Sequence, residues 1–278
     1  MKLIADYHTH TVYSHGTGSV LENAAAAKRQ GLQIVGIADH GPANLFGIGV
    51  KKLSDFLQIK ADVFVARRKL SGIRVLVGAE ANIISTDGDI DIPPEILEHL
   101  DYLLVGLHPL VKTARPSDFW HLSLSNFLGK RFKQWDTRNR FYNTKAVIRA
   151  VERHPVLAVT HPGYRLNIDT KALAAVCAAR GTALEINCNH EHITPEYIKI
   201  ARDVGVKFLV GSDAHRPEDV GRLERGLILI AETGLSAADV LNSAGQGDED
   251  SREAHIHRGG INSRLAEIRR KKRAHRLQ

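Results

Sequence analysis

The sequence predicts an α/β protein whose parallel strands form a barrel within a single domain. Short apolar runs alternate with segments of helical spacing, and seven such units fit within about 240 of the 278 residues. The apolar runs are continuous rather than alternating, as expected for strands that are buried on both faces by flanking helices. Seven units in this length of chain favour a barrel over an open sheet.

The predicted strands are the runs rich in Val, Ile and Leu. They cover residues 3–6, 34–39, 75–80, 102–107, 157–160, 183–187 and 208–211. The predicted helices cover residues 20–30, 55–70, 144–154, 170–180 and 195–203, with further helical segments at 227–233 and 236–241. Gly31, Gly181 and Gly205 follow three of these helices, at the position where C-terminal caps favour glycine. Ser236 has a side chain suited to capping the last helical segment.

A histidine pair follows the first predicted strand. His8 and His10 are separated by one residue, so in an extended chain both side chains point to the same face. His15 follows in a turn rich in Ser and Gly and is close enough to reach the same pocket. Two neutral imidazoles on one face can hold one metal ion, although fifteen histidines in the chain make a chance pair a real alternative.

Nearly every later strand also ends in a histidine or a polar side chain that can bind metal. The residues at these ends are Asp39 and His40, Glu80, His108, His161, Asn187, and Asp213 with His215. In parallel α/β barrels the reactive groups come from the C-terminal ends of different strands. One buried histidine is usually explained by core packing, but packing explains the whole set poorly. Imidazole and carboxylate ligands suit Zn, Mn or Fe, and nine candidates are enough for two or three divalent ions.

These motifs resemble those of the PHP (polymerase and histidinol phosphatase) family. The matching segments are Asp6-x-His8-Thr9-His10, Ala38-Asp39-His40, Gly78-x-Glu80, His108-Pro109, His161-Pro162 and Ser212-Asp213-Ala214-His215. They occur in the family's order over about residues 1–245. The chain is most similar to stand-alone phosphoesterases and to the PHP module of bacterial X-family DNA polymerases. The resemblance implies a distorted (β/α)7 barrel, which is TIM-barrel-like, with a trinuclear metal site.

The resemblance also implies a role for each candidate ligand. One metal would take His8, His10, Glu80 and Asp213; a second would share Glu80 and add His108 and His161; a third would take His15, His40 and His215. Glu80, Asp213 and Arg165 are then the catalytic candidates. Arg165 and Arg216 are candidates for binding the substrate phosphate, with surface salt bridges as the alternative. Asp6 and Asp39 are expected to orient imidazoles.

Basic charge is concentrated in one internal segment and one tail. Residues 109–150 contain nine Lys or Arg against two Asp, interleaved with aromatic residues, and residues 252–278 contain nine against two Glu. The internal insertion is either a helical excursion whose aromatic side chains pack on the barrel or a cationic lid over the metal pocket. The tail is a solvated end or a contact for nucleic acid. We therefore divide the chain into a barrel at residues 1–245 and a polar linker with a basic tail at 246–278.

The predicted activity is hydrolysis of a phosphate monoester, either a small phosphorylated metabolite or a nucleotide, by a metal-activated hydroxide. One alternative is a nuclease or nucleic-acid-end phosphatase that uses the basic tail. Another is an amidohydrolase-type enzyme, but that class typically has a bridging lysine where this chain has His108. There is no apolar run of about 20 residues and no signal peptide, and the two cysteines lack ligand spacing. These features predict a cytoplasmic protein with no membrane contact.

Overall fold

The computed structural model describes residues 1–129 and 133–244. Its strands are β1 (Ala5–Thr9), β2 (Ile34–Ile37), β3 (Arg74–Val77), β4 (Glu80–Asn82), β5 (Leu104–Gly106), β6 (Ala158–Val159), β7 (Ala183–Asn187) and β8 (Phe208–Gly211). They form two sheets with the orders β1-β2-β3 and β4-β5-β6-β7-β8, and every neighbouring pair is parallel. The prediction of a parallel α/β fold is therefore confirmed.

The third predicted strand is interrupted. β3 ends at Val77 and β4 begins at Glu80, so the chain passes from one sheet to the other between them. The ring of Tyr102 fills the space beside Gly78, where a Cβ would come within 2.1 Å of a ring carbon. Parallel bridges between His40 and Glu80, and between Thr9 and Ala214, connect the two sheets beyond their strand ends. The described residues thus form a TIM-barrel-like arrangement of two sheets, and their ladders do not run as one continuous closed ring.

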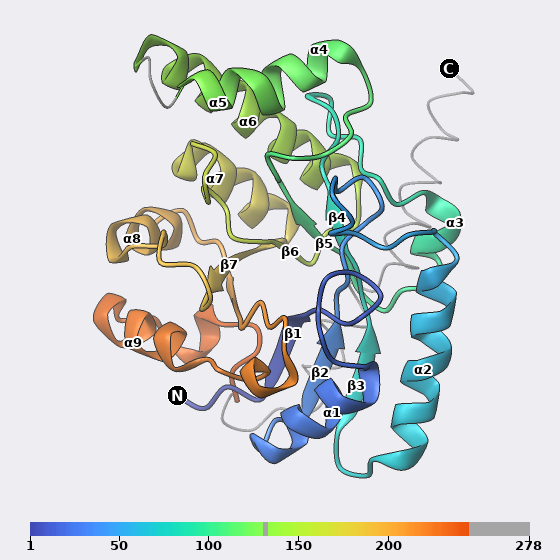
Figure 1. Ribbon diagram of the computed structural model, residues 1–278. Coiled ribbons are helices and arrows are strands. Elements are labelled where there is room, and N and C mark those ends of the chain that lie inside the picture. Colours follow the sequence, from blue (N-terminus) through green and yellow to red (C-terminus); the bar gives the residue numbers. More distant parts are fainter. Residues whose placement is uncertain (130–132, 245–278) are drawn as a thin grey trace, which may run out of the picture.

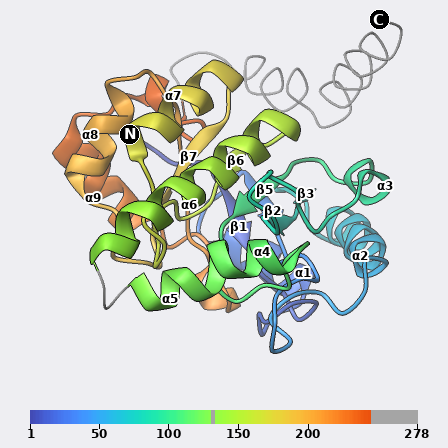
Figure 2. The same ribbon diagram turned by 90° about the horizontal axis from the view of Figure 1, so that it is seen from above.

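Helices surround these strands. They are α1 (Val20–Arg29), α2 (Asp55–Lys69), α3 (Pro94–Leu97), α4 (Pro116–Phe119), α5 (Ser125–Gly129), α6 (Lys133–Arg153), α7 (Thr170–Arg180), α8 (Pro195–Arg202) and α9 (Glu224–Thr233). In Figure 1, α1 and α2 cover one side of the strands and α7 to α9 cover the other. Seen from above in Figure 2, the strands lie in the middle with helices around them. None of the described helices is both long and apolar enough to cross a membrane.

The ends of several helices follow the expected chemistry. The Ser19 side chain accepts a hydrogen bond from the Glu22 backbone, and the Glu22 carboxylate accepts one from the Ser19 backbone, which caps α1. Gly181 ends α7 in the left-handed region, as predicted. Gly31 and Gly205 also have positive φ just after α1 and α8. Ser236 caps a short 3-10 helix at Ala237–Asp239 rather than a longer helix to residue 241.

The apolar core has two parts. A large cluster fills the space between the sheets and the helices and includes Phe56, Ile59, Leu103 and Phe208. A smaller cluster lies among the strands and includes Tyr7, Leu76 and Leu209 together with small residues. Alanines such as Ala5, Ala38, Ala158 and Ala183 make room there for the rings of Tyr7 and Tyr102, which pack edge to face. Tyr102 donates its hydroxyl hydrogen to the backbone oxygen of Tyr7 at 2.7 Å.

The basic and aromatic insertion between β5 and β6 is helical where it is described. It comprises α4, a π-helical turn at Trp120–Leu124, α5 and α6, and α4 and α5 lie across α6 in Figure 1. The expectation that its aromatic side chains pack on the barrel is wrong for Phe119, Phe127 and Phe141, which are 46%, 74% and 64% exposed. Lys130, Arg131 and the tail at 252–278 lie outside the described residues. The predicted limits at residues 245 and 246 therefore stay predictions.

Candidate metal centre

The nine predicted ligands come together at the C-terminal ends of the strands. His8 lies within β1 and Glu80 opens β4, and the other seven follow strands or lie in the loops after them. These seven are His10, His15, His40, His108, His161, Asp213 and His215. Parallel strands end on the same side of a sheet, so residues far apart in the sequence meet at one place. The structure thus brings all nine candidates into one cluster, six of which line a single cavity.

The carboxylate of Glu80 lies at the centre of this pocket and is completely buried. Its Oε2 is 2.8 Å from His40 Nδ1 and 3.3 Å from His8 Nε2. Its Oε1 is 2.9 Å from His161 Nε2 and 3.4 Å from His108 Nε2. The two oxygens therefore face different imidazoles, which is the arrangement that a carboxylate shared by two metal ions requires.

The imidazole nitrogens also approach one another closely. His8 Nε2 is 3.1 Å from His10 Nε2, and His108 Nε2 is 3.3 Å from His161 Nε2. Two nitrogens that bind one zinc ion at about 2.0–2.1 Å in tetrahedral geometry are separated by about 3.3 Å. His15 completes the cluster, since its ring centroid lies 4.1 Å from that of His215. These separations are those of ligand pairs around common ions.

Several buried donor and acceptor atoms in the cluster have no hydrogen-bond partner. They are His10 Nδ1, His40 Nδ1, Glu80 Oε2 and His215 Nε2. Although His40 Nδ1 and Glu80 Oε2 are close, they do not form a hydrogen bond. An unsatisfied buried polar group costs about 1–3 kcal/mol, so the cluster gains little stability by itself. Three groups of residues have potential metal-ligand atoms that all lie within 4.8 Å of one another. The groups are His10 with His40 and His215, His8 with His10 and Asp213, and His40 with Glu80 and His108. The residues present therefore fit divalent metal ions.

The protonation states of four of these residues suit the same role. Burial lowers the pKa of His15 and of His108 to about 4, which leaves neutral imidazoles with a lone pair for a metal. Burial alone would raise the pKa of Glu80, but the nearby His40, His8 and His108 outweigh it and hold that pKa well below its usual range. Burial and His8 act on Asp213 in the same opposed way, and its pKa is also well below the usual range. Both carboxylates are therefore anionic at neutral pH.

Buried neighbours fix the orientation of the imidazoles. Glu185 Oε1 lies 2.7 Å from His8 Nδ1, which leaves Nε2 facing Glu80, and Glu185 Oε2 accepts a hydrogen bond from the His161 backbone. Asn82 Oδ1 lies 2.7 Å from His108 Nδ1. Glu185 and Asn82 were not among the predicted site residues. Glu185 could have been found from the sequence, because it is a charged residue in the middle of the buried strand at 183–187. No feature of the sequence indicated Asn82.

Asp6 and Asp39 do not orient imidazoles, in contrast to the prediction. Asp6 accepts hydrogen bonds from the backbones of His8, Ser212 and Gly221 and from the Ser212 hydroxyl. Asp39 accepts from the backbone and hydroxyl of Thr11 and from the hydroxyl of Ser14. Both carboxylates therefore hold the loops that carry the histidines, because short loops leave backbone donors that strands do not satisfy.

The two predicted phosphate-binding arginines differ in their surroundings. Arg165 lines the pocket, with its guanidinium 4.9 Å from the centroid of the Tyr164 ring. Arg216 is not among the lining residues, and its Nε lies 2.9 Å from Asp219 Oδ2 and 3.8 Å from Glu218 Oε1. The alternative of a surface salt bridge therefore describes Arg216, which we no longer regard as a site residue.

His190 is a pocket residue that the sequence did not single out. Its Nε2 lies 3.2 Å from Asp213 Oδ2, and its ring stacks on Tyr164 with centroids 3.8 Å apart. The loop that carries it has no strand or helix of its own, so periodicity gave no signal. The Asn187 side chain accepts hydrogen bonds from the backbones of Asn189 and His190 and so fixes this loop.

Three residues of the pocket have strained backbones. His161, Arg165 and Asp213 have φ values of 28°, 59° and 53°, a region that favours glycine. The only other such non-glycine residue in the described chain is Phe46. Strain of this kind persists where the surroundings impose it and is concentrated at functional sites. Here it accompanies the cavity of about 240 Å³ that six of the nine candidate ligands line.

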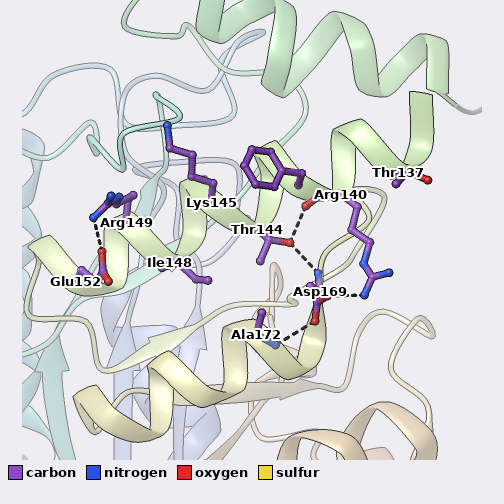
Figure 3. Close-up of a pocket in the computed structure, with 10 residues that line it drawn as sticks. Thr137, Arg140, Thr144, Lys145, Ile148, Arg149, Glu152, Asp169 and Ala172 are labelled. Atoms are coloured by element: carbon purple, nitrogen blue, oxygen red, sulfur yellow. Dashed lines mark hydrogen bonds and ion pairs between the residues drawn. The ribbon is translucent and has the colours of Figure 1, made fainter. Parts of the chain in front are cut away.

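A second and larger cavity lies on the outer face of the molecule. It has a volume of about 550 Å³ and lies between α6 and α7, where Thr137, Phe141, Lys145 and Ala172 are among its lining residues. Figure 3 shows Arg140 and Thr144 of α6 reaching Asp169 at the start of α7. None of the candidate metal ligands lines this outer cavity.

The spacing of the nine ligands can be compared with known families. A model of the PHP domain matches residues 6–256, which is most of the chain. The chain belongs to the PHP family. The resemblance of this chain to the PHP family, which was predicted from the sequence motifs, is therefore confirmed. The strand-end histidines are part of the matched region.

Curated relatives and a solved structure extend this result. A protein named as a probable phosphatase from Thermoanaerobacter sp. (strain X514) is 34% identical over 256 residues, covering 87% of this chain and 91% of the relative. Another protein with that name, from Shewanella sp. (strain MR-4), is 30% identical and covers 87% and 88%. A histidinol phosphate phosphatase from Lactococcus lactis, solved with zinc, L-histidinol and phosphate, has a TM-score of 0.58. It is 15% identical and covers 84% of this chain and 94% of its own, so it shows that the PHP chain shares its fold.

Proposed function

We propose that this PHP protein is a metal-dependent phosphatase that hydrolyses the phosphate monoester of a small molecule. The observation that carries the proposal is the convergence of nine candidate metal-binding side chains, seven of which form groups with ligand atoms within 4.8 Å of one another and several of which have unpartnered buried atoms. The phosphatase names of the relatives support the same class of reaction. Family membership argues against the amidohydrolase alternative. No described residue favours the nuclease alternative, which rested on the basic tail.

The proposal assigns three metal ions, Zn, Mn or Fe, to the nine side chains. As before, we assign His8, His10, Glu80 and Asp213 to one ion, Glu80 with His108 and His161 to a second, and His15, His40 and His215 to a third. The grouping of His8, His10 and Asp213 supports the first set, and the approach of both His108 and His161 to Glu80 Oε1 supports the second. His40 lies close to Glu80 as well as to His15, so it stands at the boundary between two sets.

Divalent ions at these positions supply Lewis acidity, which lowers the pKa of a water and offsets the charge of phosphoryl oxygens. The chain itself contributes fixed geometry and charge. Glu80 and Asp213 stay anionic, and Glu185 and Asn82 hold His8 and His108 in one orientation. Such positioning groups typically change metal affinity or activity by about 10–100-fold.

Arg165 is the residue that we assign to the substrate phosphate. It lines the pocket beside the ligand His161, and no carboxylate in the described chain forms an ion pair with it. A guanidinium matches two phosphate oxygens with parallel hydrogen bonds. Its left-handed backbone indicates that the fold holds it in place at some cost. We therefore expect Arg165 to bind the phosphate from the open side of the pocket.

The test is metal-dependent hydrolysis. The purified protein should contain more than one equivalent of metal per chain by elemental analysis. After chelation it should lose hydrolysis of p-nitrophenyl phosphate and regain it when Zn, Mn or Fe is added. An amide substrate and a DNA substrate serve as controls for the two alternative activities. A folded protein that takes up no metal, or that is loaded and hydrolyses no phosphate monoester, would contradict the proposed function.

A further inference from the structure

The pocket has two different walls beyond the metal ligands. Ile48, from the loop after β2, and Pro109 and Leu110, from the loop after β5, form an apolar wall. The two loops are joined by backbone hydrogen bonds, from Leu45 to the oxygen of Leu110 at 3.1 Å and from Lys112 to the oxygen of Ala43 at 2.8 Å. Tyr164, Arg165 and His190, from the loops after β6 and β7, form the other wall. The alcohol part of a phosphate ester bound at the metal ligands would contact these two groups of residues.

The apolar wall exposes surface that a ligand can cover. Leu110 is 52% exposed. Phe46 does not itself line the cavity but lies in the same loop, between the lining residues Asn44 and Ile48, and it is 84% exposed with a φ of 61°. A bulky aromatic residue is unfavourable both in that exposure and in that backbone region. Covering apolar surface of this kind is favourable in proportion to its area. This wall therefore favours an apolar group over a charged one.

The second wall presents a flat aromatic face. The rings of Tyr164 and His190 are nearly parallel, with an interplanar angle of 9°. The backbone nitrogen of His190 donates to Asn187, and its backbone oxygen accepts from Arg225. A fixed aromatic face of this kind stacks well against a planar or apolar group.

The charges of the pocket disfavour a cationic substrate group. Arg165 is a cation with no ion-pair partner in the described chain, and bound metal ions add further positive charge. Asp213 is the only carboxylate among the lining residues, and the proposed function assigns it to a metal. Asn44 Oδ1, which lacks a hydrogen-bond partner, is an uncharged acceptor. An ammonium group in this pocket would meet repulsion and no counter-charge.

We propose that the alcohol part of the substrate is small and uncharged and carries a short apolar chain or a single ring, and that esters of amino alcohols are poor substrates. This inference rests on the proposed function, because it concerns the leaving group of that reaction. The volume of about 240 Å³ supports a small alcohol, since pockets for drug-sized ligands have about 300–1,000 Å³. Histidinol phosphate, whose alcohol carries an amine, falls in the disfavoured class.

The test compares two esters of the same shape. Propyl phosphate and 2-aminoethyl phosphate differ only in a terminal methyl or ammonium group. With the metal-loaded full-length protein at pH 7, kcat/KM should be at least about tenfold higher for propyl phosphate, and added salt should reduce the difference. The ammonium group makes its alcohol the better leaving group, so intrinsic reactivity acts against the expected result. Calorimetry with propylphosphonate and 2-aminoethylphosphonate, which are not hydrolysed, should show the same order of affinity.

A charge introduced on the apolar wall gives the matched variants. Leu110→Asp places a carboxylate at an exposed position and should shift the ratio of kcat/KM toward 2-aminoethyl phosphate by at least about fivefold. Leu110→Asn has the same shape without the charge and should keep the wild-type ratio. Equal or better use of 2-aminoethyl phosphate by the wild type would overturn the inference and leave the phosphatase intact. Failure to hydrolyse any monoester, including p-nitrophenyl phosphate, would instead overturn the proposed function and this inference with it.

Discussion

The outer cavity and the cavity at the candidate metal centre differ in how their charges are satisfied. The outer cavity between α6 and α7 is the larger, at about 550 Å³, and each of its cations has a carboxylate partner. The pairs are Arg140 with Asp169 at 2.7 Å, Lys145 with Asp87 at 3.4 Å, and Arg149 with Glu152 at 2.9 Å. Figure 3 shows the first and third of these contacts. The outer cavity therefore has no unpaired cation that could attract an anionic ligand.

The smaller cavity, at the candidate metal centre, contains polar and charged groups that lack partners. Buried nitrogens of three histidines and an oxygen of Glu80 lack hydrogen-bond partners there, Arg165 is unpaired in the described chain, and three residues have strained backbones. The unpartnered buried atoms and the strained backbones lower stability and have no benefit unless a ligand is bound. The comparison teaches that a concentration of unmet polar groups together with strained backbones marks this site better than cavity volume does.

The largest expected effect comes from removing the central charge. Glu80→Gln keeps the shape of the side chain but replaces a carboxylate that lies within 4 Å of five imidazoles. If Glu80 is shared by two metal ions as proposed, this change should lower kcat for a phosphate monoester by at least about 10³-fold, or about 4 kcal/mol of transition-state stabilisation. Metal content per chain should fall with it, and both are measured on the same purified sample.

Glu152→Gln in the outer cavity is the matched control. It makes the same chemical change in a partly exposed carboxylate that is paired with Arg149. Kinetic constants and metal content should stay within about twofold of the wild type, since a surface pair contributes little. If Glu80→Gln retained wild-type activity and metal content, Glu80 would not be a shared ligand.

The second effect is intermediate and concerns the unpaired arginine. Arg165→Ala should lower kcat/KM by about 10–100-fold, or about 1.4–2.8 kcal/mol, because it removes a bidentate contact to the reacting phosphate. Arg165→Lys should recover only part of the loss, because an ammonium cannot match two oxygens in the same way. Steady-state kinetics with one phosphate ester measures both variants.

Arg140→Ala is the control for the same residue type. Arg140 is paired with Asp169 and lies in the outer cavity, so its removal should leave kcat/KM unchanged. Equal losses in the Arg165 and Arg140 variants would mean that Arg165 acts through folding and has no contact with substrate.

The candidate metal ligands were predictable because their positions depend on simple rules of strand geometry. A parallel sheet places every strand end on one side, so the sequence positions of His40, His108 and His161 were enough to predict that they meet. His8 and His10 share a face because a strand has a period of two. The set of nine came from these rules together with the family motifs, and their convergence in space follows from the fold.

The remaining features depend on contacts that have no sequence period. His190 is placed by a loop that hydrogen-bonds to Asn187, and Asn82 meets His108 only because β4 and β5 pair. The break between β3 and β4 was also missed, since Val75 to Glu80 has the composition of one strand. The insertion also differs from one of its two predicted arrangements: Phe127 and Phe141 are exposed, whereas their apolar side chains suggested packing on the barrel. Tertiary packing decides each of these features.

The smallest effect separates two roles of Asp169 in the outer cavity. Its Oδ2 pairs with Arg140, and its Oδ1 accepts a hydrogen bond from the backbone of Ala172 and so caps α7. Asp169→Asn loses the charge but keeps an oxygen for the cap, so it should cost less than about 1 kcal/mol, as expected for an exposed ion pair. Asp169→Ala also loses the cap and should cost about 1 kcal/mol more in the free energy of unfolding. Denaturant unfolding of both variants and of Arg140→Ala measures these differences, and kcat/KM should not change in any of them. A loss of activity in Asp169→Asn without a loss of stability would mean that the outer cavity is coupled to the metal centre, and the contrast between the two cavities would then fail.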